Sequence, residues 1–288
     1  MRYLNAEDTR SALPMSDAVA AMRHAFTGDS ETPLRTMVGS SLVMPGRLDD
    51  LTAVKVVSAV PGNPVGIVVV FGPDGSPIGL VDGPTLTAIR TGAVCGLATQ
   101  LLTSDQPKSL AMLGAGAMAY DQIEAIRAVR RIDRLLVWSQ TPKNAETLAT
   151  RVGGETVVDA NEAVAQADVV SCATPAISPL FDETAIRPGT HINAVGAFTP
   201  EMVEVPPEIV TRAFVVVDDV DAAAAEAGDL IQAGRGPDAT LAELLAGTLP
   251  GQADVTLFKS VGVAAQDVAA AKSALENAAK LGLGVELD

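Results

Sequence analysis

Three isolated cationic residues could act on an anionic substrate. Arg35 lies in Pro-Leu-Arg-Thr, Lys55 interrupts the apolar run Ala-Val-Lys-Val-Val, and Arg90 lies in Leu-Thr-Ala-Ile-Arg-Thr-Gly. Guanidinium groups bind carboxylates through charge-assisted hydrogen bonds. A lysine within an apolar strand either extends its amine to the surface or is buried, and a buried ammonium must be paired or have a lowered pKa. The spacing leaves both interpretations of Lys55 open.

A glycine-rich turn provides the second chemical signal. The sequence Gly114-Ala-Gly116-Ala-Met-Ala119 follows an apolar run at 109–113 and precedes a helix-like segment at 120–129. In a dinucleotide-binding turn the first glycine permits the tight turn, the second lets the backbone approach a pyrophosphate, and the third small residue lets helix and strand pack closely. Amide groups at the helix start then face the phosphates. We therefore prefer a nicotinamide cofactor site to a purely structural turn, and expect contacts from Gly114, Ala115, Gly116, Ala117 and Met118.

The end of the next predicted strand bears on which nicotinamide cofactor binds. An NAD site usually has an Asp or Glu there to hold the ribose hydroxyls. This chain instead has Ser139, Gln140, Thr141 and Lys143. Hydroxyl, amide and ammonium groups suit a 2′-phosphate, so the sequence favours NADPH over NADH. An ordinary polar turn that caps the next helix is the alternative, and both can hold together.

Composition excludes several classes of function. The chain has 288 residues, 48% of them hydrophobic, a net charge of −15 and a pI of about 4.5. Such an acidic protein does not attract phosphate backbones, which argues against nucleic-acid binding. Cys95 and Cys172 lie far apart in apolar segments and are expected to be buried free thiols. His24 and His191 are the only histidines, and no Cys/His cluster accompanies them, so no metal site is expected.

No targeting or membrane segment is expected. The N-terminus lacks the apolar core of a signal peptide. The most apolar stretch, 54–71, contains Lys55, Pro61, Asn63 and Pro64, which a membrane span would not tolerate. We therefore expect a soluble cytoplasmic protein with no membrane partner.

The order of predicted elements indicates an α/β protein with two domains. A helix at 16–27 precedes strands at 36–44, 51–58, 66–71 and 77–82, with turns that include Pro61-Gly-Asn-Pro64, and a helix at 84–102. This strand meander predicts a separate mixed sheet. From 108 the pattern alternates between strands and helices, which is typical of a doubly wound, Rossmann-type parallel sheet. The predicted strands are 109–113, 134–139, 156–158, 168–173, 191–195, 214–218 and 254–258. An Ala-rich helix at 266–281 could pack back on the first unit.

Short motifs along nearly the whole chain, from about residue 3 to 272, resemble the ornithine cyclodeaminase/mu-crystallin family. They are Pro33-Leu-Arg35, Lys55-Val-Val-Ser, Asp82-Gly, Leu86-Thr-Ala-Ile-Arg90-Thr-Gly-Ala, Gly114-Ala-Gly116, Ala173-Thr-Pro175, His191-Ile-Asn-Ala-Val-Gly196 and Leu257-Phe-Lys-Ser-Val-Gly262. The resemblance implies a substrate-binding and dimerisation domain from residues 1–105 and 264–288, with an NAD(P)-binding Rossmann domain at 106–263.

The resemblance also implies roles for individual residues. Arg35, Lys55 and Arg90 would surround the substrate carboxylate beside the nicotinamide. Ser139, Gln140, Thr141 and Asn144 would surround the adenosine phosphate, and Thr174 and Ser260 would lie near the cofactor. Val261 would line the substrate pocket. A homodimer follows from the implied dimerisation domain and from the apolar strands of the first sheet, which need a covering partner.

One departure from the family pattern bears on the reaction. Cyclodeaminases of this family carry an Asp in the loop after the Ile-Asn-Ala-Val-Gly strand, where it handles the distal amine of the substrate. Here the loop reads Gly196-Ala-Phe198-Thr-Pro-Glu201, so Phe198 stands in place of the carboxylate unless Glu201 or Glu204 takes that register. An apolar ring in the substrate pocket suits a cyclic imine without a second amine.

The sequence therefore predicts an NADPH-dependent reductase of a cyclic ketimine carboxylate, such as Δ1-pyrroline-2-carboxylate or Δ1-piperideine-2-carboxylate. The product would be the L-imino acid, proline or pipecolate. A lyase on the same scaffold, either an ornithine or lysine cyclodeaminase or a hydroxyproline dehydratase, is the first alternative. A non-enzymatic small-molecule binding protein like mu-crystallin is the second. Ring size and physiological direction stay open.

Overall fold

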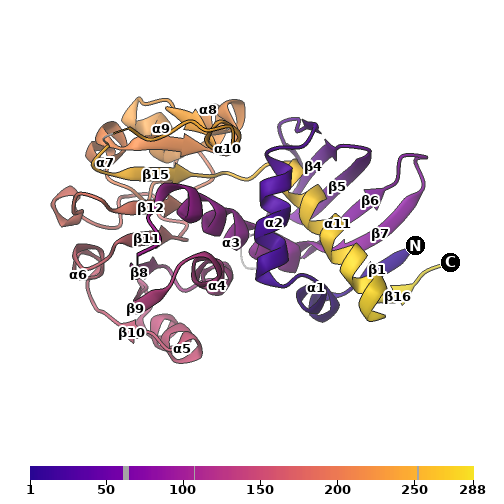
Figure 1. Ribbon diagram of the computed structural model, residues 1–288, viewed down its shortest axis with the longest axis horizontal. Helices are drawn as coiled ribbons and strands as arrows, with labels where there is room; N and C mark the ends of the chain where they lie inside the picture. Colours follow the sequence, from indigo (N-terminus) through magenta and orange to yellow (C-terminus); the bar gives the residue numbers. More distant parts are fainter. Residues whose placement is uncertain (61–64, 107, 252) are drawn as a thin grey trace. The chain divides into compact units, whose positions relative to one another are not determined.

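The computed structural model describes residues 1–60, 65–106, 108–251 and 253–288, which form two compact units (Figure 1). The first combines Met1–Ala93 with Gly262–Asp288, and the second is Val94–Val261. Helix α3 (Gly83–Leu102) contributes residues to both units. The turn expected at 61–64 lies outside the described residues.

The first unit is built on a mixed sheet with strand order β16-β1-β7-β6-β5-β4-β2, and β3 also pairs with β4. Its strands are β1 (Arg2–Leu4), β2 (Ser30–Glu31), β3 (Thr36–Val38), β4 (Ser41–Leu48), β5 (Leu51–Ser58), β6 (Gly66–Phe71), β7 (Pro77–Asp82) and β16 (Val285–Glu286). The single strand expected at 36–44 is wrong. Gly39 has a φ of 60°, a left-handed conformation that glycine adopts readily, and the turn at this point separates β3 from β4.

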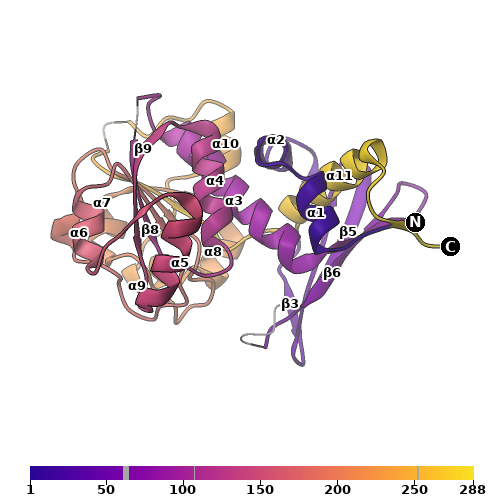
Figure 2. The same cartoon turned by 90° about the horizontal axis from the view of Figure 1, so that it is seen from below.

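Helices α1 (Ala6–Ala12), α2 (Met15–Ala25) and α11 (Ala264–Leu281) accompany this sheet. Helix α11 packs along α2 and against β4, β5 and β6 (Figures 1 and 2). Small residues permit this close approach: a Cβ added to Gly46 on β4 would lie 2.5 Å from the Cβ of Ala264. The sequence at the end of the chain thus forms part of the same core as the first ninety residues.

The second unit contains a wholly parallel sheet with strand order β10-β9-β8-β11-β12-β15-β13-β14. The strands are β8 (Lys108–Leu113), β9 (Ile132–Trp138), β10 (Glu155–Thr156), β11 (Val169–Cys172), β12 (His191–Ala194), β13 (Phe214–Val217), β14 (Ala239–Thr240) and β15 (Thr256–Lys259). This topology confirms the prediction of a Rossmann-type α/β fold. In such sheets ligands bind at the carboxyl ends of the strands.

Helices surround the parallel sheet (Figure 2). They are α4 (Ala119–Val129), α5 (Pro142–Val152), α6 (Ala160–Ala165), α7 (Pro207–Arg212), α8 (Val220–Glu226), α9 (Gly228–Ala233) and α10 (Leu241–Leu245), with a 3₁₀ turn η1 (Glu183–Ala185). The core between β8, β9, α4 and α5 contains Leu110, Met112, Ile123 and Leu148, each less than a tenth exposed. Burying one such side chain stabilises the fold by about 1.5–3 kcal/mol.

The sequence predicted neither a membrane-spanning helix nor a disulfide. The following findings apply to the described residues. Among them, no helix is both long and apolar enough to cross a membrane. Cys95 and Cys172 are both buried, and neither is in a disulfide.

Candidate active site

A buried cluster of charges occupies the first unit. Lys55 on β5 and Arg90 on α3 both bind the carboxylate of Asp267, which lies in the first turn of α11. The Lys55 Nζ is 2.8 Å from Asp267 Oδ2, and the Arg90 Nε is 3.1 Å from Asp267 Oδ1. Arg90 also donates from Nη1 to Oε1 of Gln266 at 2.7 Å. Two predicted site residues, far apart in sequence, thus meet at one carboxylate.

The alternation of β5 explains why Lys55 is buried. Ala53 and Lys55 are 2% exposed, whereas Thr52 before them and Val56 after them are exposed. In register, Lys55 lies opposite Met44 on β4 and Val68 on β6, both of which are buried. The structure therefore resolves the two interpretations of Lys55 in favour of a buried ammonium rather than surface snorkelling.

Burial and its neighbours set the ionisation of Lys55. Loss of solvent lowers the pKa of Lys55 to about 8; Asp267 opposes this shift, while the positive charges of Arg90 and Arg35 add to it. Burial alone would raise the pKa of Asp267, but Lys55 and Arg90 more than offset this and keep the carboxyl below its usual range. At neutral pH the cluster holds an ionised Asp267 and a largely protonated lysine that can lose its proton readily.

Arg35 is the third predicted cation. It lies in the connection between β2 and β3 and is half-buried. Its charge contributes to lowering the Lys55 pKa, so it acts on the same cluster. Three cations against one carboxylate leave an excess of positive charge in an otherwise acidic protein, which suits an anionic ligand.

In the second unit, the glycine-rich turn has the geometry of a phosphate-binding loop. Gly114 has a φ of 109°, and a Cβ there would lie 2.6 Å from the carbonyl oxygen of Ala173. Gly116 is exposed, and a Cβ there would meet nothing within 4 Å, so its backbone faces open space. Ala119 begins helix α4 and is completely buried. These features fit the pyrophosphate of a dinucleotide.

The residues predicted around the adenosine phosphate follow β9. Ser139 Oγ accepts a hydrogen bond from the amide of Thr141 at 3.3 Å, and α5 begins directly afterwards. Gln140, Thr141, Lys143 and Asn144 are exposed. Lys143 is 3.4 Å from Glu146 on the same helix, and its side chain is 81% exposed. The turn carries no carboxylate before Glu146.

The remaining predicted residues also follow parallel strands. Thr174 follows β11, Phe198 follows β12, and Ser260 and Val261 follow β15. Because the strands are parallel, these positions share the carboxyl edge of the sheet with Gly114 and Ser139. Phe198 is 45% exposed and Val261 is 7% exposed. The Oγ of Ser260 donates to Oδ2 of Asp218 at 2.6 Å.

Sequence reasoning missed three polar or charged residues that these sites use. Asp267 and Gln266 hold Lys55 and Arg90, and Asp218 holds Ser260. A signal for Asp267 was present: it is a lone carboxylate in the apolar sequence Ala-Ala-Gln-Asp-Val-Ala-Ala, as Lys55 is a lone amine in an apolar strand. Such matching charges in apolar surroundings predict a buried pair.

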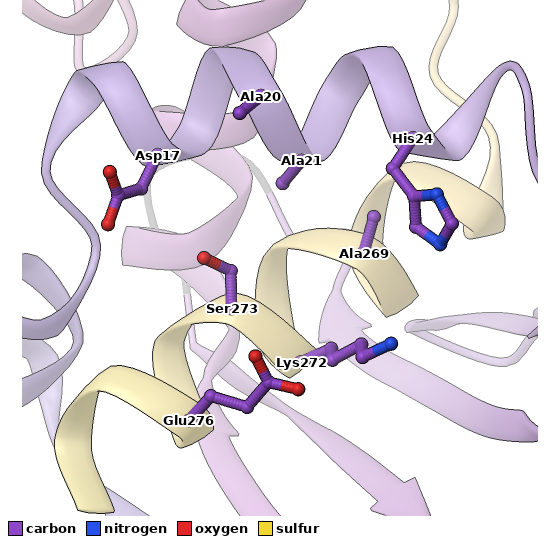
Figure 3. Close-up of a pocket in the computed structure, with 8 residues that line it drawn as sticks. All are labelled: Asp17, Ala20, Ala21, His24, Ala269, Lys272, Ser273 and Glu276. Carbon is purple, nitrogen blue, oxygen red and sulfur yellow. The ribbon is translucent and has the colours of Figure 1, made fainter. Parts of the chain in front are cut away.

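No group of metal ligands occurs in the part of the chain that the structure describes. His24 bonds Asp49 at 2.7 Å, and the buried His191 bonds Thr256 and Asn193. A shallow hollow of about 260 Å³ lies between α2 and α11 (Figure 3). Its lining residues are Asp17, Ala20, Ala21, His24, Ala269, Lys272, Ser273 and Glu276, and none of them is a predicted site residue.

Comparisons with known proteins agree with the resemblance seen in the motifs. The family model described as the ornithine cyclodeaminase/mu-crystallin family matches residues 5–281. A Δ1-pyrroline-2-carboxylate reductase of Bacillus cereus is 33% identical over the full length of both chains. The ketimine reductase mu-crystallin of Mus musculus is 33% identical over 94% of this chain and 95% of its own.

A solved structure extends the likeness to the fold. The Δ1-pyrroline-2-carboxylate reductase of Thermococcus litoralis, in complex with NADH and L-proline, superposes with a TM-score of 0.93 and 34% identity over the whole of both chains. The chain belongs to the ornithine cyclodeaminase/mu-crystallin family.

Proposed function

We propose that this protein reduces a cyclic ketimine carboxylate with a reduced nicotinamide cofactor, as Δ1-pyrroline-2-carboxylate reductases do. The observation that carries the proposal is the buried cluster of Lys55 and Arg90 at Asp267, with Arg35 nearby. It combines an excess of positive charge for a carboxylate with an amine whose pKa is close to neutral. The similarity to Δ1-pyrroline-2-carboxylate reductases and to the ketimine reductase mu-crystallin supports the same reaction.

Arg35 and Arg90 would bind the substrate carboxylate by charge-assisted hydrogen bonds. Arg90 is suited to this role because Asp267 and Gln266 fix its guanidinium from one side. A fixed guanidinium pre-orients the carboxylate, and with it the imine carbon that must accept hydride. Such positioning contributes a large share of the acceleration in two-substrate reactions.

Lys55 would supply the proton that the reaction requires. A protonated imine accepts hydride far better than a neutral one, and the product nitrogen keeps the added proton. A pKa of about 8 means that Lys55 is charged at neutral pH yet loses its proton at low cost. If Lys55 only contacts the carboxylate, the proton comes from water, and the kinetic tests below separate these roles.

The second unit would hold the cofactor. The backbone of Gly114, Ala115, Gly116, Ala117 and Met118 would hold the pyrophosphate at the start of α4, with Thr174 and Ser260 at the nicotinamide side. When bound, the reduced nicotinamide supplies the hydride. We propose NADPH as the preferred form, with NADH weaker, because Ser139, Gln140, Thr141 and Lys143 offer hydrogen-bond donors and a positive charge where NAD sites usually have a carboxylate.

Phe198 favours reduction over cyclodeamination. It occupies the loop position at which cyclodeaminases of the family carry an Asp for the distal amine. The side chain of Phe198 is 45% exposed, so an apolar ring of the substrate could pack on it. A substrate with a second ammonium group would find no carboxylate at that position.

We also propose that the protein is a homodimer. Lys55 points to one face of the sheet. On the other face, Val43, Val56 and Ile67 lie side by side on the neighbouring strands β4, β5 and β6. Val56 is 36% exposed and Ile67 is 42% exposed. Ile78 on β7 is 41% exposed. Contiguous apolar side chains on a sheet face are usually covered by a partner, and a second copy with two-fold symmetry would cover both faces at once.

The direct test of the reductase proposal uses a matched pair of substrates. The protein should oxidise NADPH in the presence of Δ1-pyrroline-2-carboxylate. Unsubstituted Δ1-pyrroline, which lacks the carboxylate, should react at least about 30-fold more slowly in kcat/KM, given the roughly 2–4 kcal/mol of a charged hydrogen-bond pair. Equal reaction of the two imines would refute a role for the cationic cluster in binding. No turnover of either would refute the reductase proposal.

A further inference from the structure

A buried carboxylate in the second unit joins two loops at the carboxyl edge of the parallel sheet. Glu204 is completely buried. Its Oε1 accepts hydrogen bonds from the amide and hydroxyl of Thr174, at 2.6 and 2.9 Å. Its Oε2 accepts from the amides of Gly196 and Ala197, at 2.7 and 3.0 Å. Thr174 follows β11 and Gly196 follows β12, so one side chain holds the loops after two neighbouring strands.

Two further buried charges hold Glu204 in place. Asp229 accepts from the amides of Glu204 and Val205 through Oδ1, at 2.7 and 2.9 Å. Its Oδ2 lies 2.7 Å from the Nζ of Lys259, and both side chains are completely buried. Lys259 also donates to the carbonyl oxygen of Ala197. The segment from Gly196 to Val205 is thereby tied at both ends to the same network.

The two loops are packed as closely as the backbone allows. A Cβ added to Gly196 would lie 2.1 Å from the amide nitrogen of Thr174 and 2.6 Å from Oε1 of Glu204. The tied segment carries Phe198 on its exposed side. Because buried ion networks are often no more stabilising than apolar packing, three buried charges at this edge call for a role in fixing geometry.

We propose that Glu204 is a positioning residue, whose carboxylate holds Thr174 and the Phe198 loop in the form that binds cofactor and substrate. The part of the inference that concerns the Phe198 loop and the substrate rests on the proposed reductase function. The part that concerns Thr174 requires only that this edge of the sheet binds the cofactor. Glu204 itself does not touch the reacting atoms in this account. It acts through the two loops, with Asp229 and Lys259 as its support.

The variant Glu204→Gln tests this with little change in shape. Every group that contacts the Glu204 carboxylate is a hydrogen-bond donor. In the Gln variant an NH₂ group, which cannot accept, replaces one carboxylate oxygen. The hydrogen bonds either from Thr174 or from Gly196 and Ala197 are therefore lost. Asp168→Asn is the matched control: Asp168 likewise accepts from an amide and a hydroxyl, those of Ser109, both at 2.9 Å, but just before β11, at the amino edge of the sheet.

Three quantities are measured well below the melting temperature. They are the amide hydrogen exchange of peptides containing 174 and 196–197, the Kd of the nucleotide that the wild type binds more tightly, and KM and kcat for the cyclic imine. In Glu204→Gln we expect faster exchange in these peptides, and a Kd and an imine KM raised about 10-fold to 100-fold. Asp168→Asn should lower the melting temperature but leave Kd and KM within about twofold, as expected for a site that only stabilises the fold.

Unchanged Kd and KM in Glu204→Gln, with or without faster exchange, would reduce Glu204 to a structural residue and overturn the inference. If the Gln variant does not fold, Glu204→Asp, which keeps the charge and shortens the side chain by one methylene, is measured with the same criteria. If the wild type does not reduce cyclic imines, the proposed function fails, while nucleotide Kd and exchange still decide the role of Glu204.

Discussion

Removal of the Asp267 charge should change the pH dependence of the reaction. Asp267 lies 2.8 Å from the Lys55 Nζ and opposes the lowering of the Lys55 pKa, which stands at about 8. In Asp267→Asn the buried ammonium loses its counter-charge but keeps Arg90 and Arg35 as neighbours. The Lys55 pKa should therefore fall further. Since burial already favours the neutral amine, Lys55 of the variant should be largely deprotonated at physiological pH.

The size of the effect follows from the distance. An opposite charge within about 4–6 Å shifts a pKa by about 1–3 units, so loss of the Asp267 charge, 2.8 Å from the Lys55 Nζ, should lower the Lys55 pKa by about 1.5 units. At pH 7.5 a group with a pKa of about 8 is roughly three-quarters protonated, and a group with a pKa near 6.5 is roughly one-tenth protonated. We expect activity at pH 7.5 to fall about eightfold, with recovery at about pH 6.

The measurement is the pH profile of kcat and of kcat/KM for the cyclic imine, with saturating nucleotide. The ionisation of the imine itself affects both proteins equally, so the difference between the two profiles reports Lys55. Glu276→Gln removes the same charge from an exposed position of α11 and should leave the profile unchanged. If activity falls at the same alkaline pH in the wild type and in Asp267→Asn, the account of Lys55 is refuted. If kcat/KM decreases at alkaline pH but kcat does not, Lys55 contributes to substrate binding and not to proton donation.

Three further outcomes are expected. NADPH should bind at least about tenfold tighter than NADH, about 1.4 kcal/mol, in a fluorescence titration, and Lys143→Glu should narrow the gap; a preference for NADH would defeat this assignment. Arg90→Ala should lower kcat/KM about 30-fold to 1,000-fold through loss of a buried charged hydrogen bond, whereas Lys55→Met should lower kcat more than it raises KM if Lys55 donates the proton. Light scattering should give twice the 29.5 kDa chain mass, and Ile67→Lys, which charges the open sheet face, should shift the protein to monomers; a monomeric wild type at micromolar concentration would contradict the dimer.

Periodicity and turn residues were sufficient to predict the parallel sheet. The strand, turn and helix around Gly114 occur where expected, because a buried strand, a glycine turn and an amphipathic helix each have a local sequence pattern. Helices were expected in the gaps between the strands, but the short helices α7, α9 and α10 were not placed individually, since five or six residues show a helical period only weakly. The predicted strand at 36–44 failed because the turn at Gly39 interrupts an otherwise continuous β-prone run.

The candidate site was only half predictable for a different reason. Arg35, Lys55 and Arg90 could be singled out as cations in apolar surroundings. Asp267, the common partner of Lys55 and Arg90, comes from a helix near the other end of the chain. The same holds for Glu204, Asp229 and Lys259, which come from three separate elements. A lone charge in an apolar segment indicates that a buried partner exists, but tertiary packing decides which residue that partner is, and no local pattern identifies it.

The proposed reaction is tested most directly by giving the wild-type protein the two cyclic imines and ornithine side by side. Δ1-Pyrroline-2-carboxylate with NADPH should give L-proline with matching loss of reduced nucleotide, and the six-membered imine should give L-pipecolate if the pocket admits the larger ring. Ornithine with NAD⁺ should give neither proline nor ammonia, because Phe198 stands where a cyclodeaminase carries its Asp. Release of ammonia and proline from ornithine, without reduction of either imine, would contradict the account and assign the protein to the cyclodeaminases.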